Sequence, residues 1–365
     1  MISVFGSDLG EAEIVGVTDS IERQWVGMGE KVEEFEHQLR DHLGVEDVAL
    51  VDSGSNALML AVKVLDLPPG SEVIVPTVTW VACAHAVRLA GLNPVFCDVD
   101  VATGNVTADS VRQRISPRTS AIMVVHYAGR PVDMDEIRAF GLPIIEDAAH
   151  AISSSIGDTP CGSLGDIAIL SFDPVKNLAT SDSGCVAGRA DLVAQARRLR
   201  YCGLEQAGYV ASKSRPGRWW EQEIVEAYPR FIPNDVAAAF GLAQLERLPE
   251  LQARRKSIWE TYQSELIDIS GLHLPPDAEE GTSHSYFTYL VRVENRRDEL
   301  ANELRSKGIY TTFRYQPLHL TDYYRTDYRL VDSERLNEEG LNLPLHPRLS
   351  HSDIEEVVEA VRSFL

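Results

Sequence analysis

The chain has 365 residues, 44% of them hydrophobic, and a formal net charge of −21. A chain of this length and apolar content can bury a substantial core, which favours a globular protein over a disordered one. The acidic balance argues against a nucleic-acid binder or a protein that docks on anionic lipid, because both need a basic face.

The five cysteines are scattered, odd in number and without CxxC spacing, so the sequence predicts neither a disulfide framework nor a metal site. Residues 1–16 contain no basic region followed by an apolar one. The apolar runs are all shorter than the roughly 20 residues that a membrane span needs. These observations predict a soluble, cytoplasmic protein with no membrane or nucleic-acid partner.

Along the first half of the chain, helical and strand-like patterns alternate. Apolar residues at Val32, Phe35, Leu39 and Leu43 have helical spacing, so an amphipathic helix is expected over 29–44. The strand-like runs cover 47–55, 71–80, 93–100, 119–129, 142–150, 166–172 and 183–188, and the helix-like segments include 56–67 and 81–91. This alternation is typical of an α/β domain around a buried, mostly parallel sheet.

The pattern changes from about residue 235, where a long helix is expected over 235–266 with a bend near Pro249. A linker-like stretch follows at 275–285. The sequence then predicts strand, helix, strand and helix in a small α+β unit of roughly 100 residues. These elements cover 286–293, 297–308, 309–317 and 351–365.

We therefore expect a large domain over residues 1–250 and a small C-terminal domain over 251–365, with roughly the first 20 residues packing on the small one. In open α/β sheets, ligands bind in the loops at the carboxyl ends of the strands. The residues that carry chemistry should therefore lie where the strands of the large domain end.

Two strand ends are followed by a helix start. The segment DSGSNAL places Gly54, Ser55 and Asn56 where free backbone N–H groups form an anion site, although an ordinary helix cap would look the same. Trp80 stands at another strand-to-helix junction. Its indole could stack on a flat ligand, but core packing is the commoner fate of a tryptophan.

Two further candidates carry charge. The segment IIEDAAH ends a strand at Glu146 and Asp147, and a carboxylate there could hold a protonated ring nitrogen while His150 reaches a neighbouring oxygen. A capping role for Asp147 is the alternative. Lys176 is solitary, follows an apolar run and precedes a turn-rich one. A solvated surface lysine is the default interpretation for any lysine taken alone.

Taken together, these features describe a phosphate cradle, a carboxylate, a stacking ring and an isolated lysine on the loops of one sheet. Pyridoxal 5′-phosphate (PLP) requires such a set. A lysine forms the Schiff base, a carboxylate keeps the pyridine nitrogen protonated, and amides and a ring hold the cofactor. The combination favours a catalytic role for Lys176 over a surface one.

Six segments occur in order along nearly the whole chain. They are WVGMGEKVEEFEHQLRDHLGVEDVALVDSGSNAL, VIVPTVTWVACAHAVRLAGLNPVFCDVD, IIEDAAHA, GSLGDIAILSFDPVKNLATSDSG, NDVAAAFGLAQLERL and LNLPLHPRLSHSDIEEVVEAV. As an ordered set, they resemble the DegT/DnrJ/StrS-type sugar aminotransferase family of fold-type I PLP enzymes. The resemblance implies an α/β, aspartate aminotransferase-like fold and a homodimer with its active site at the subunit interface. It also implies glutamate as amino donor and a cofactor that cycles between PLP and pyridoxamine 5′-phosphate (PMP).

Carried over by motif, the resemblance implies Lys176 and Asp147 as catalytic residues, the first bound covalently to PLP and the second in contact with its pyridine nitrogen. His150 would lie near the 3′-oxygen and Trp80 on the ring, while Gly54, Ser55 and Ser171 would bind the phosphate. The full cofactor-binding set is Gly54, Ser55, Asn56, Trp80, Asp147, His150, Ser171, Lys176 and Arg230.

The chain departs from the family pattern at several positions. Asp173 stands where the family usually has histidine, and ATSDSG replaces TTGEGG, so the loop around the lysine is expected to differ in shape. Arg230 stands where an asparagine often reaches the other subunit's phosphate, an anion that arginine can serve at least as well. The segment RYQPLH offers Arg314, Tyr315 and His319 as substrate residues. Arg314 could pair with a carboxylate or a diphosphate, or lie at the surface.

The predicted activity is amino transfer from glutamate to a keto-sugar in the amino-sugar biosynthesis that serves antibiotics or polysaccharides. The preferred acceptor is a nucleotide-linked 4-keto-6-deoxyhexose aminated at C-4 rather than C-3, and a keto-cyclitol of the scyllo-inosose type is the alternative. A PLP- or PMP-dependent sugar dehydratase is the alternative reaction, but such relatives carry histidine at the position of Lys176. A non-catalytic regulator would be expected to lose Lys176 or Asp147. A Rossmann oxidoreductase would need GxGxxG after the first strand, where GSN stands.

Overall fold

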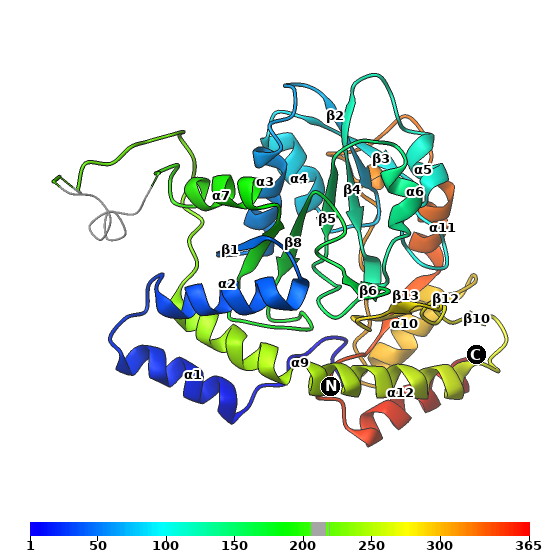
Figure 1. Ribbon diagram of the computed structural model, residues 1–365. Coiled ribbons are helices and arrows are strands. Elements are labelled where there is room, and N and C mark those ends of the chain that lie inside the picture. The colour runs from blue at the N-terminus through cyan, green and yellow to red at the C-terminus, as the bar shows by residue number, and fades with distance from the viewer. Residues whose placement is uncertain (206–216, 219) are drawn as a thin grey trace.

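The computed structural model describes residues 1–205, 217, 218 and 220–365. A seven-stranded sheet forms the centre of the large domain, with helices on both faces, and a smaller unit lies toward the lower right in Figure 1. The strand order is β1-β9-β8-β5-β4-β2-β3. The strands are β1 (Asp47–Val51), β2 (Glu72–Pro76), β3 (Asn93–Cys97), β4 (Thr119–Val125), β5 (Ile144–Asp147), β8 (Ile167–Ser171) and β9 (Gly184–Gly188).

Most of this sheet is parallel. β2 runs parallel to β3 and β4, and β5 runs parallel to β4 and β8, whereas β9 is antiparallel to both of its neighbours. Successive residues of a strand face opposite sides, so the sheet has two apolar layers. Val48 and Leu50 belong to one layer, and Ala49 and Val51 to the other. The predicted α/β class with a mostly parallel sheet is confirmed.

Each face of the sheet is covered by its own set of helices. The layer of Ala49 contains α3 (Gly54–Val64), α4 (Ala82–Leu89) and α7 (Ala190–Leu199). The layer of Val48 contains α2 (Glu30–Leu43), α5 (Ala108–Arg112) and α6 (Met134–Arg138). A 3-10 turn, η1 (Tyr127–Gly129), follows β4.

A long helix, α9 (Asp235–Leu266), connects the two parts of the molecule. Pro249 lies inside it, and Figure 1 shows that its two halves run in different directions. The first half packs on α1 (Glu11–Glu22) and α2, whereas the second half contributes Trp259 to the core of the small unit. The domain boundary predicted at residue 250 thus falls inside one continuous helix.

The start of α2 depends on the start of α9. Asp235 Oδ1 accepts hydrogen bonds from the backbone N of Gly29 at 2.9 Å and of Val32 at 3.1 Å. These are the donors that a helix leaves unsatisfied in its first turn. The apolar side of α2 faces the sheet as its spacing predicts, with Phe35 and Leu39 both 0% exposed. The cap of α2 therefore comes from a residue far along the chain.

The small unit contains a three-stranded antiparallel sheet of order β10-β12-β13. Its elements are β10 (Leu272–His273), β12 (Tyr289–Val293), α10 (Arg297–Ser306), β13 (Gly340–Leu343) and α12 (His351–Phe364). The connection from α10 to β13 contains η2 (Leu318–Leu320) and α11 (Val331–Glu339), which pack against the large domain. A further small sheet joins the two parts and consists of β6 (Ser155–Ile156), β7 (Thr159–Pro160) and β11 (Thr282–Ser283). Among the described helices, none combines the length and apolar character that crossing a membrane requires.

The strand predicted over 309–317 does not belong to a sheet, and that prediction is wrong. Ile309 forms an isolated bridge with Ile2, and Thr312 forms another with Asn342. The two partners lie on different segments, so the backbone never runs beside one neighbour long enough to form a ladder. The first residues of the chain therefore pack on the small unit, while α1 packs on α9.

Candidate active site

The predicted site residues lie where neighbouring strands end. Asp147 is the last residue of β5 and Ser171 is the last residue of β8. Trp80 lies between β2 and α4, and Gly54 opens α3. The carboxyl ends of parallel strands meet at one edge of a sheet, so the topology gathers these residues from positions far apart in the sequence.

Lys176 lies in the segment that follows β8, residues 172–183, here called the lysine loop. The backbone N of Val175 donates to Asp173 Oδ1 at 3.0 Å, and the backbone N of Lys176 donates to the carbonyl of Asp173 at 2.9 Å. Asp173 therefore caps a tight turn directly before the lysine. This gives a structural role to the residue that stands where the family usually has histidine.

The amine of Lys176 is held in a partly buried, partly aromatic environment. Its Nζ atom lies 5.0 Å from the ring centroid of Phe287. Burial lowers the pKa of Lys176 to about 8, assisted by the positive charge of Arg314 and opposed by the carboxylate of Asp147. A lysine with such a pKa is neutral in a useful fraction of molecules near neutral pH, which nucleophilic and proton-transfer chemistry requires.

Asp147 is a buried carboxylate with both oxygens engaged. Its Oδ1 atom accepts a hydrogen bond from the backbone N of Ala149 at 3.0 Å, and its Oδ2 atom accepts one from the thiol of Cys83 at 3.2 Å. Burial raises the pKa of Asp147, whereas these hydrogen bonds and the charge of Lys176 lower it. The carboxylate retains further lone pairs that can accept from a cationic N–H.

Gly54, Ser171 and Gly184 converge in one cradle. A Cβ atom on Gly54 would stand 2.6 Å from the Cβ of Ser171, and one on Gly184 would stand 2.7 Å from the backbone N of Gly54. Ser53 caps α3 by accepting from the backbone N of Asn56 at 3.2 Å. The start of α3 therefore lies in close contact with the end of β8 and the start of β9, which only small residues permit, and a helix N-terminus in such a place favours a bound anion.

A set of rings lies beside Lys176 and Asp147. His150 stacks on Phe287 with centroids 3.9 Å apart, and its Nε2 atom is 3.4 Å from the hydroxyl of Tyr315. Tyr315 in turn lies 5.6 Å from Trp80 between centroids, and Trp80 is 54% exposed. An exposed tryptophan beside buried polar groups can cover the face of a flat ligand.

The residues present fit PLP. His150 Nδ1 is buried, and no partner for it is found among the described residues, so it can serve a ligand oxygen. Burial and the charges of Lys176 and Arg314 lower the pKa of His150 well below its usual range, which keeps the ring neutral. The cradle suits a phosphate, and Asp147 suits a protonated ring nitrogen.

Several predicted residues have other partners in the structure. Asn56 donates from its side chain to Asp52 Oδ1 at 2.7 Å, so only its position places it at the cradle. His319 is buried, with Nδ1 2.7 Å from Thr77 Oγ1 and Nε2 3.5 Å from Glu334 Oε1. These bonds fasten η2 to the end of β2. A direct role for either side chain in ligand binding stays a prediction.

The two predicted arginines lie in different places. Arg314 is near the site, with its guanidinium carbon 3.6 Å from the ring centroid of Phe5, and its charge lowers the pKa of Lys176. Arg230 is exposed before α9, where its backbone bridges to Tyr201. In the described part of the chain, no contact joins Arg230 to the residues around Lys176. Its predicted role at the partner subunit's cofactor is untested.

Sequence reasoning did not single out Cys83 or Phe287, although both lie against the site. Cys83 contacts Asp147, and Phe287 lies between His150 and Lys176. The signal for Cys83 is its place in the first turn of a helix that follows a strand end. That place alone does not indicate a contact with Asp147, because the contact depends on how the first turn of α4 lies beside the end of β5.

A second polar cluster lies on the opposite face of the sheet, formed by His126, Glu146 and Cys161. His126 Nδ1 accepts from the backbone N of Val132 at 3.0 Å, so Nε2 carries the ring proton and donates it to Glu146 Oε1 at 2.8 Å. Both nitrogens of the ring are thereby used within the protein. The geometry gives this cluster a structural role.

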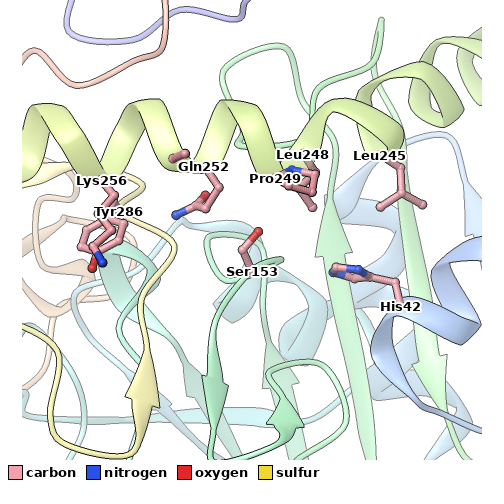
Figure 2. A pocket seen from close by; sticks show the side chains of 9 residues that line it. His42, Ser153, Leu245, Leu248, Pro249, Gln252, Lys256 and Tyr286 are labelled. Carbon is pink, nitrogen blue, oxygen red and sulfur yellow. The ribbon is translucent and has the colours of Figure 1, made fainter.

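A cavity of about 350 Å³ lies between α9 and the strands beneath it, and Figure 2 shows its lining. Its walls are mainly apolar. The lining residues are His42, Ser153, Leu245, Leu248, Pro249, Gln252, Ala253, Lys256 and Tyr286. It contains none of the predicted site residues, but Gln252 Oε1 accepts from Asn177 Nδ2 at 3.2 Å. The cavity therefore adjoins the lysine loop without forming the site.

Comparison with known proteins gives a consistent result. The family model described as the DegT/DnrJ/EryC1/StrS aminotransferase family matches residues 7–362. A relative from Saccharopolyspora spinosa, dTDP-4-dehydro-2,3,6-trideoxy-D-glucose 4-aminotransferase, is 40% identical over 98% of this chain and 95% of its own length.

Solved structures superpose over the whole chain. The aminotransferase TlmJ from Streptoalloteichus hindustanus is 42% identical, with a TM-score of 0.94 over 100% of this chain and 98% of its own. Spr1654 from Streptococcus pneumoniae, solved in a PMP form, is 28% identical, with a TM-score of 0.92 over 100% of this chain and 98% of its own. The same protein has also been solved in a PLP form.

Proposed function

The chain belongs to the DegT/DnrJ/EryC1/StrS aminotransferase family, and from this premise we propose that it moves an amino group from glutamate to C-4 of a nucleotide-linked 4-keto-6-deoxyhexose. It is a PLP-dependent enzyme of the sugar aminotransferase family, and its fold is that of fold-type I transferases. The glutamate donor, the acceptor and the position of amination are the proposed parts.

One observation carries the choice of acceptor. The chain is 40% identical to a 4-aminotransferase whose named substrate is a dTDP-linked 4-dehydro sugar without a 6-hydroxyl group. Amino transfer is favoured over dehydration by the lysine at position 176, since the related dehydratases have histidine there. The lowered pKa of Lys176 supports the same choice, because transfer needs a neutral amine.

The protein's part of the mechanism follows from the placement of its residues. PLP, when bound, would supply an electron sink and an aldehyde group that accepts the amino group and later gives it up. Asp147 would hold the protonated ring nitrogen, and His150 would offer Nδ1 to a ring oxygen. The cradle at Gly54 and Ser171 would bind the phosphate, and Trp80 would cover the ring.

Lys176 moves the proton. Its neutral Nζ would take the proton from the carbon of glutamate that bears the amino group and, in the second half-reaction, would deliver a proton to C-4 of the keto-sugar. Arg314 lies close enough to influence Lys176 and would pair with the carboxylate of glutamate or a diphosphate of the nucleotide. The ring of Phe287 lies 5.0 Å from this amine and shields part of it from water.

The acceptor can be identified with protein loaded with PMP. This form is mixed with dTDP-4-keto-2,3,6-trideoxyglucose, other 4-keto-6-deoxyhexose nucleotides, 3-keto analogues and scyllo-inosose, and the return of the PLP absorbance is followed. We expect rapid return with a 4-keto-6-deoxyhexose nucleotide, and product NMR should place the new amine at C-4.

A Lys176→Ala variant loaded with PMP is the control, because slow return in that variant would show that the lysine carries the proton. Rapid return with scyllo-inosose alone would replace the proposed acceptor with a cyclitol. Release of water from the sugar without a new C–N bond would replace transfer with dehydration. In the other half-reaction, glutamate should convert the PLP form to the PMP form faster than other amino acids do. A faster conversion by another amino acid would overturn the proposal that glutamate is the donor.

We further propose a homodimer with a shared active site. Exposed apolar side chains on α1, including Ile14, Val15 and Ile21, support a covered face, since a monomer rarely leaves such residues together in water. Ile224 and Val225 are also exposed, close in sequence to Arg230. An exposed arginine on such a surface can serve an anion in the partner subunit.

Complementation tests the shared site. A Lys176→Ala chain and an Arg230→Ala chain, each of low activity alone, should regain part of the activity when co-expressed, since a mixed dimer contains one site with both residues intact. Turnover of purified mixed dimers measures the effect. Verified mixed dimers without recovered activity would place Arg230 in its own subunit's site or outside both, and a fully active monomer would refute the dimer itself.

A further inference from the structure

A buried thiol beside Asp147 has no part in the chemistry proposed above. Cys83 lies in the first turn of α4 and is 0% exposed. Its sulfur is 3.2 Å from Asp147 Oδ2 and 3.1 Å from the hydroxyl of Thr79, which is itself buried just before the helix. These three side chains form a connected chain that runs from the turn after β2 to the end of β5.

The direction of each hydrogen bond follows from the groups involved. An ionised carboxylate can only accept, so the thiol of Cys83 donates to Asp147. A thiol has one proton, so the Thr79 hydroxyl must donate to the sulfur. The backbone N of Ala149 holds the other oxygen of Asp147. Both oxygens are thereby fixed in position.

We propose that Cys83 is a positioning residue that fixes the orientation of the Asp147 carboxylate for its contact with the cofactor's ring nitrogen. This inference rests on the role proposed for Asp147. Cys83 acts as a donor and not as a nucleophile. It is enclosed by the core, and burial together with the nearby carboxylate raises the pKa of its thiol well above the usual range.

Other titratable groups lie around Asp147 and also influence its carboxylate. Lys176 acts on it from the lysine loop and His126 from the end of β4, while Tyr315 faces it from the segment before η2. These groups remain when Cys83 is changed. The thiol's hydrogen bond favours the ionised form of Asp147, whereas burial opposes it. Without the thiol, Asp147 should hold a protonated nitrogen less strongly.

The test uses holoenzyme reconstituted with PLP that carries ¹⁵N in its ring. The ¹⁵N chemical shift reports directly whether the ring nitrogen is protonated, and a titration from about pH 6 to about pH 10 gives the midpoint of proton loss. We expect Cys83→Ala to lower this midpoint by about one pH unit. Cys83→Ser should remain within about 0.3 units of the original protein, because a hydroxyl also donates.

Two controls separate positioning from packing. Cys97 is another fully buried cysteine, and Cys97→Ala removes the same atoms at the end of β3 without touching Asp147, so its midpoint should not move. Thr79→Val keeps the shape of its side chain and removes only the hydroxyl. Thr79→Val should lower the midpoint by less than Cys83→Ala does. If Cys83→Ala does not fold, Thr79→Val still tests the hydrogen-bonded chain.

The outcomes are distinct. An unchanged midpoint in folded Cys83→Ala or Thr79→Val, or a Cys83→Ser protein that behaves like Cys83→Ala, would overturn the inference. Asp147→Asn is the reference, since it removes the carboxylate charge altogether. If Asp147→Asn leaves the midpoint unchanged, the proposed role of Asp147 fails. If it lowers the midpoint while the Cys83 variants do not, only the inference about Cys83 fails.

Discussion

Glu146 and Asp147 are consecutive residues of β5, and because side chains alternate along a strand, they serve opposite faces of the sheet. Glu146 accepts four hydrogen bonds, one from His126 Nε2 and three from backbone N–H groups of residues 162–165. From the described residues, Asp147 accepts one backbone N–H and one thiol, and it faces the charge of Lys176.

The difference between these carboxylates separates a structural role from a chemical one. The lone pairs of the Glu146 carboxylate accept hydrogen bonds from His126 and from backbone N–H groups of a turn, so this carboxylate stabilises the fold. Asp147 is nearly as buried but keeps acceptor capacity and a nearby amine. Burial alone would not tell them apart, whereas the set of donors around each carboxylate does.

The largest loss of turnover is expected from a substitution of Lys176, whose charge faces Asp147. Lys176→Ala should lower turnover by at least about 1,000-fold, because the variant loses the amine proposed to move the proton. Borohydride treatment of the holoenzyme followed by peptide mapping should find the label on Lys176. Lys256→Ala, an exposed lysine on α9, is the matched control and should retain full turnover. A label on another lysine would overturn the assignment.

Asp147→Asn should lower kcat on the order of 100-fold while the melting temperature changes little, because the amide cannot stabilise a protonated ring nitrogen. Turnover and thermal unfolding of the same preparation measure both quantities. A loss of stability in proportion to the loss of activity would instead assign Asp147 to helix capping, and the contrast with Glu146 would disappear.

Glu146→Gln should show the opposite pattern. An amide group would meet N–H donors that now bind the carboxylate, which should cost about 3 kcal/mol in the free energy of unfolding. Denaturant unfolding measures the loss, and kcat per folded molecule should stay nearly unchanged. Glu136→Gln, at an exposed position on α6, should stay within about 0.5 kcal/mol. A large drop in kcat for Glu146→Gln would contradict the purely structural role assigned to Glu146.

The smallest effect concerns Arg314. Its positive charge lowers the pKa of Lys176, so Arg314→Leu should raise that pKa above the present value of about 8, by roughly half a unit to one unit. The pH dependence of Lys176 modification in the apoprotein, followed by mass spectrometry, gives the pKa. Arg348→Leu, at an exposed position in the small unit, should leave the profile in place. A fall in the pKa would contradict the sign.

The sequence predicts those parts of the site whose signal is local. Asp147 ends an apolar run and Gly54 starts a helix, so the residue pattern alone places both at the carboxyl edge of a parallel sheet. Lys176 is notable for its isolation among small and hydroxyl residues. In each case a few neighbouring residues carry the information.

The parts of the site that the sequence does not predict depend on contacts between distant segments. The hydrogen bond between Cys83 and Asp147 exists only because the first turn of α4 lies beside the end of β5. The side chain of Asn56 donates a hydrogen bond to Asp52, and the sequence of this turn does not predict whether Asn56 binds Asp52 or a ligand. The stretch 309–317 has strand-forming residues, but its pairing partners come from the N-terminus and from β13, so no ladder forms.

The cap that Asp235 provides for α2 sets an order of events during protein synthesis. The first-turn donors of α2 and the carboxylate that binds them are 206 residues apart in the chain. At about 5–20 residues per second, the ribosome needs roughly 10–40 s to add that stretch. Throughout this time α2 lacks both the carboxylate that caps it and its contacts with α9. α2 is thus made early and completes its contacts only after most of the large sheet has been synthesised.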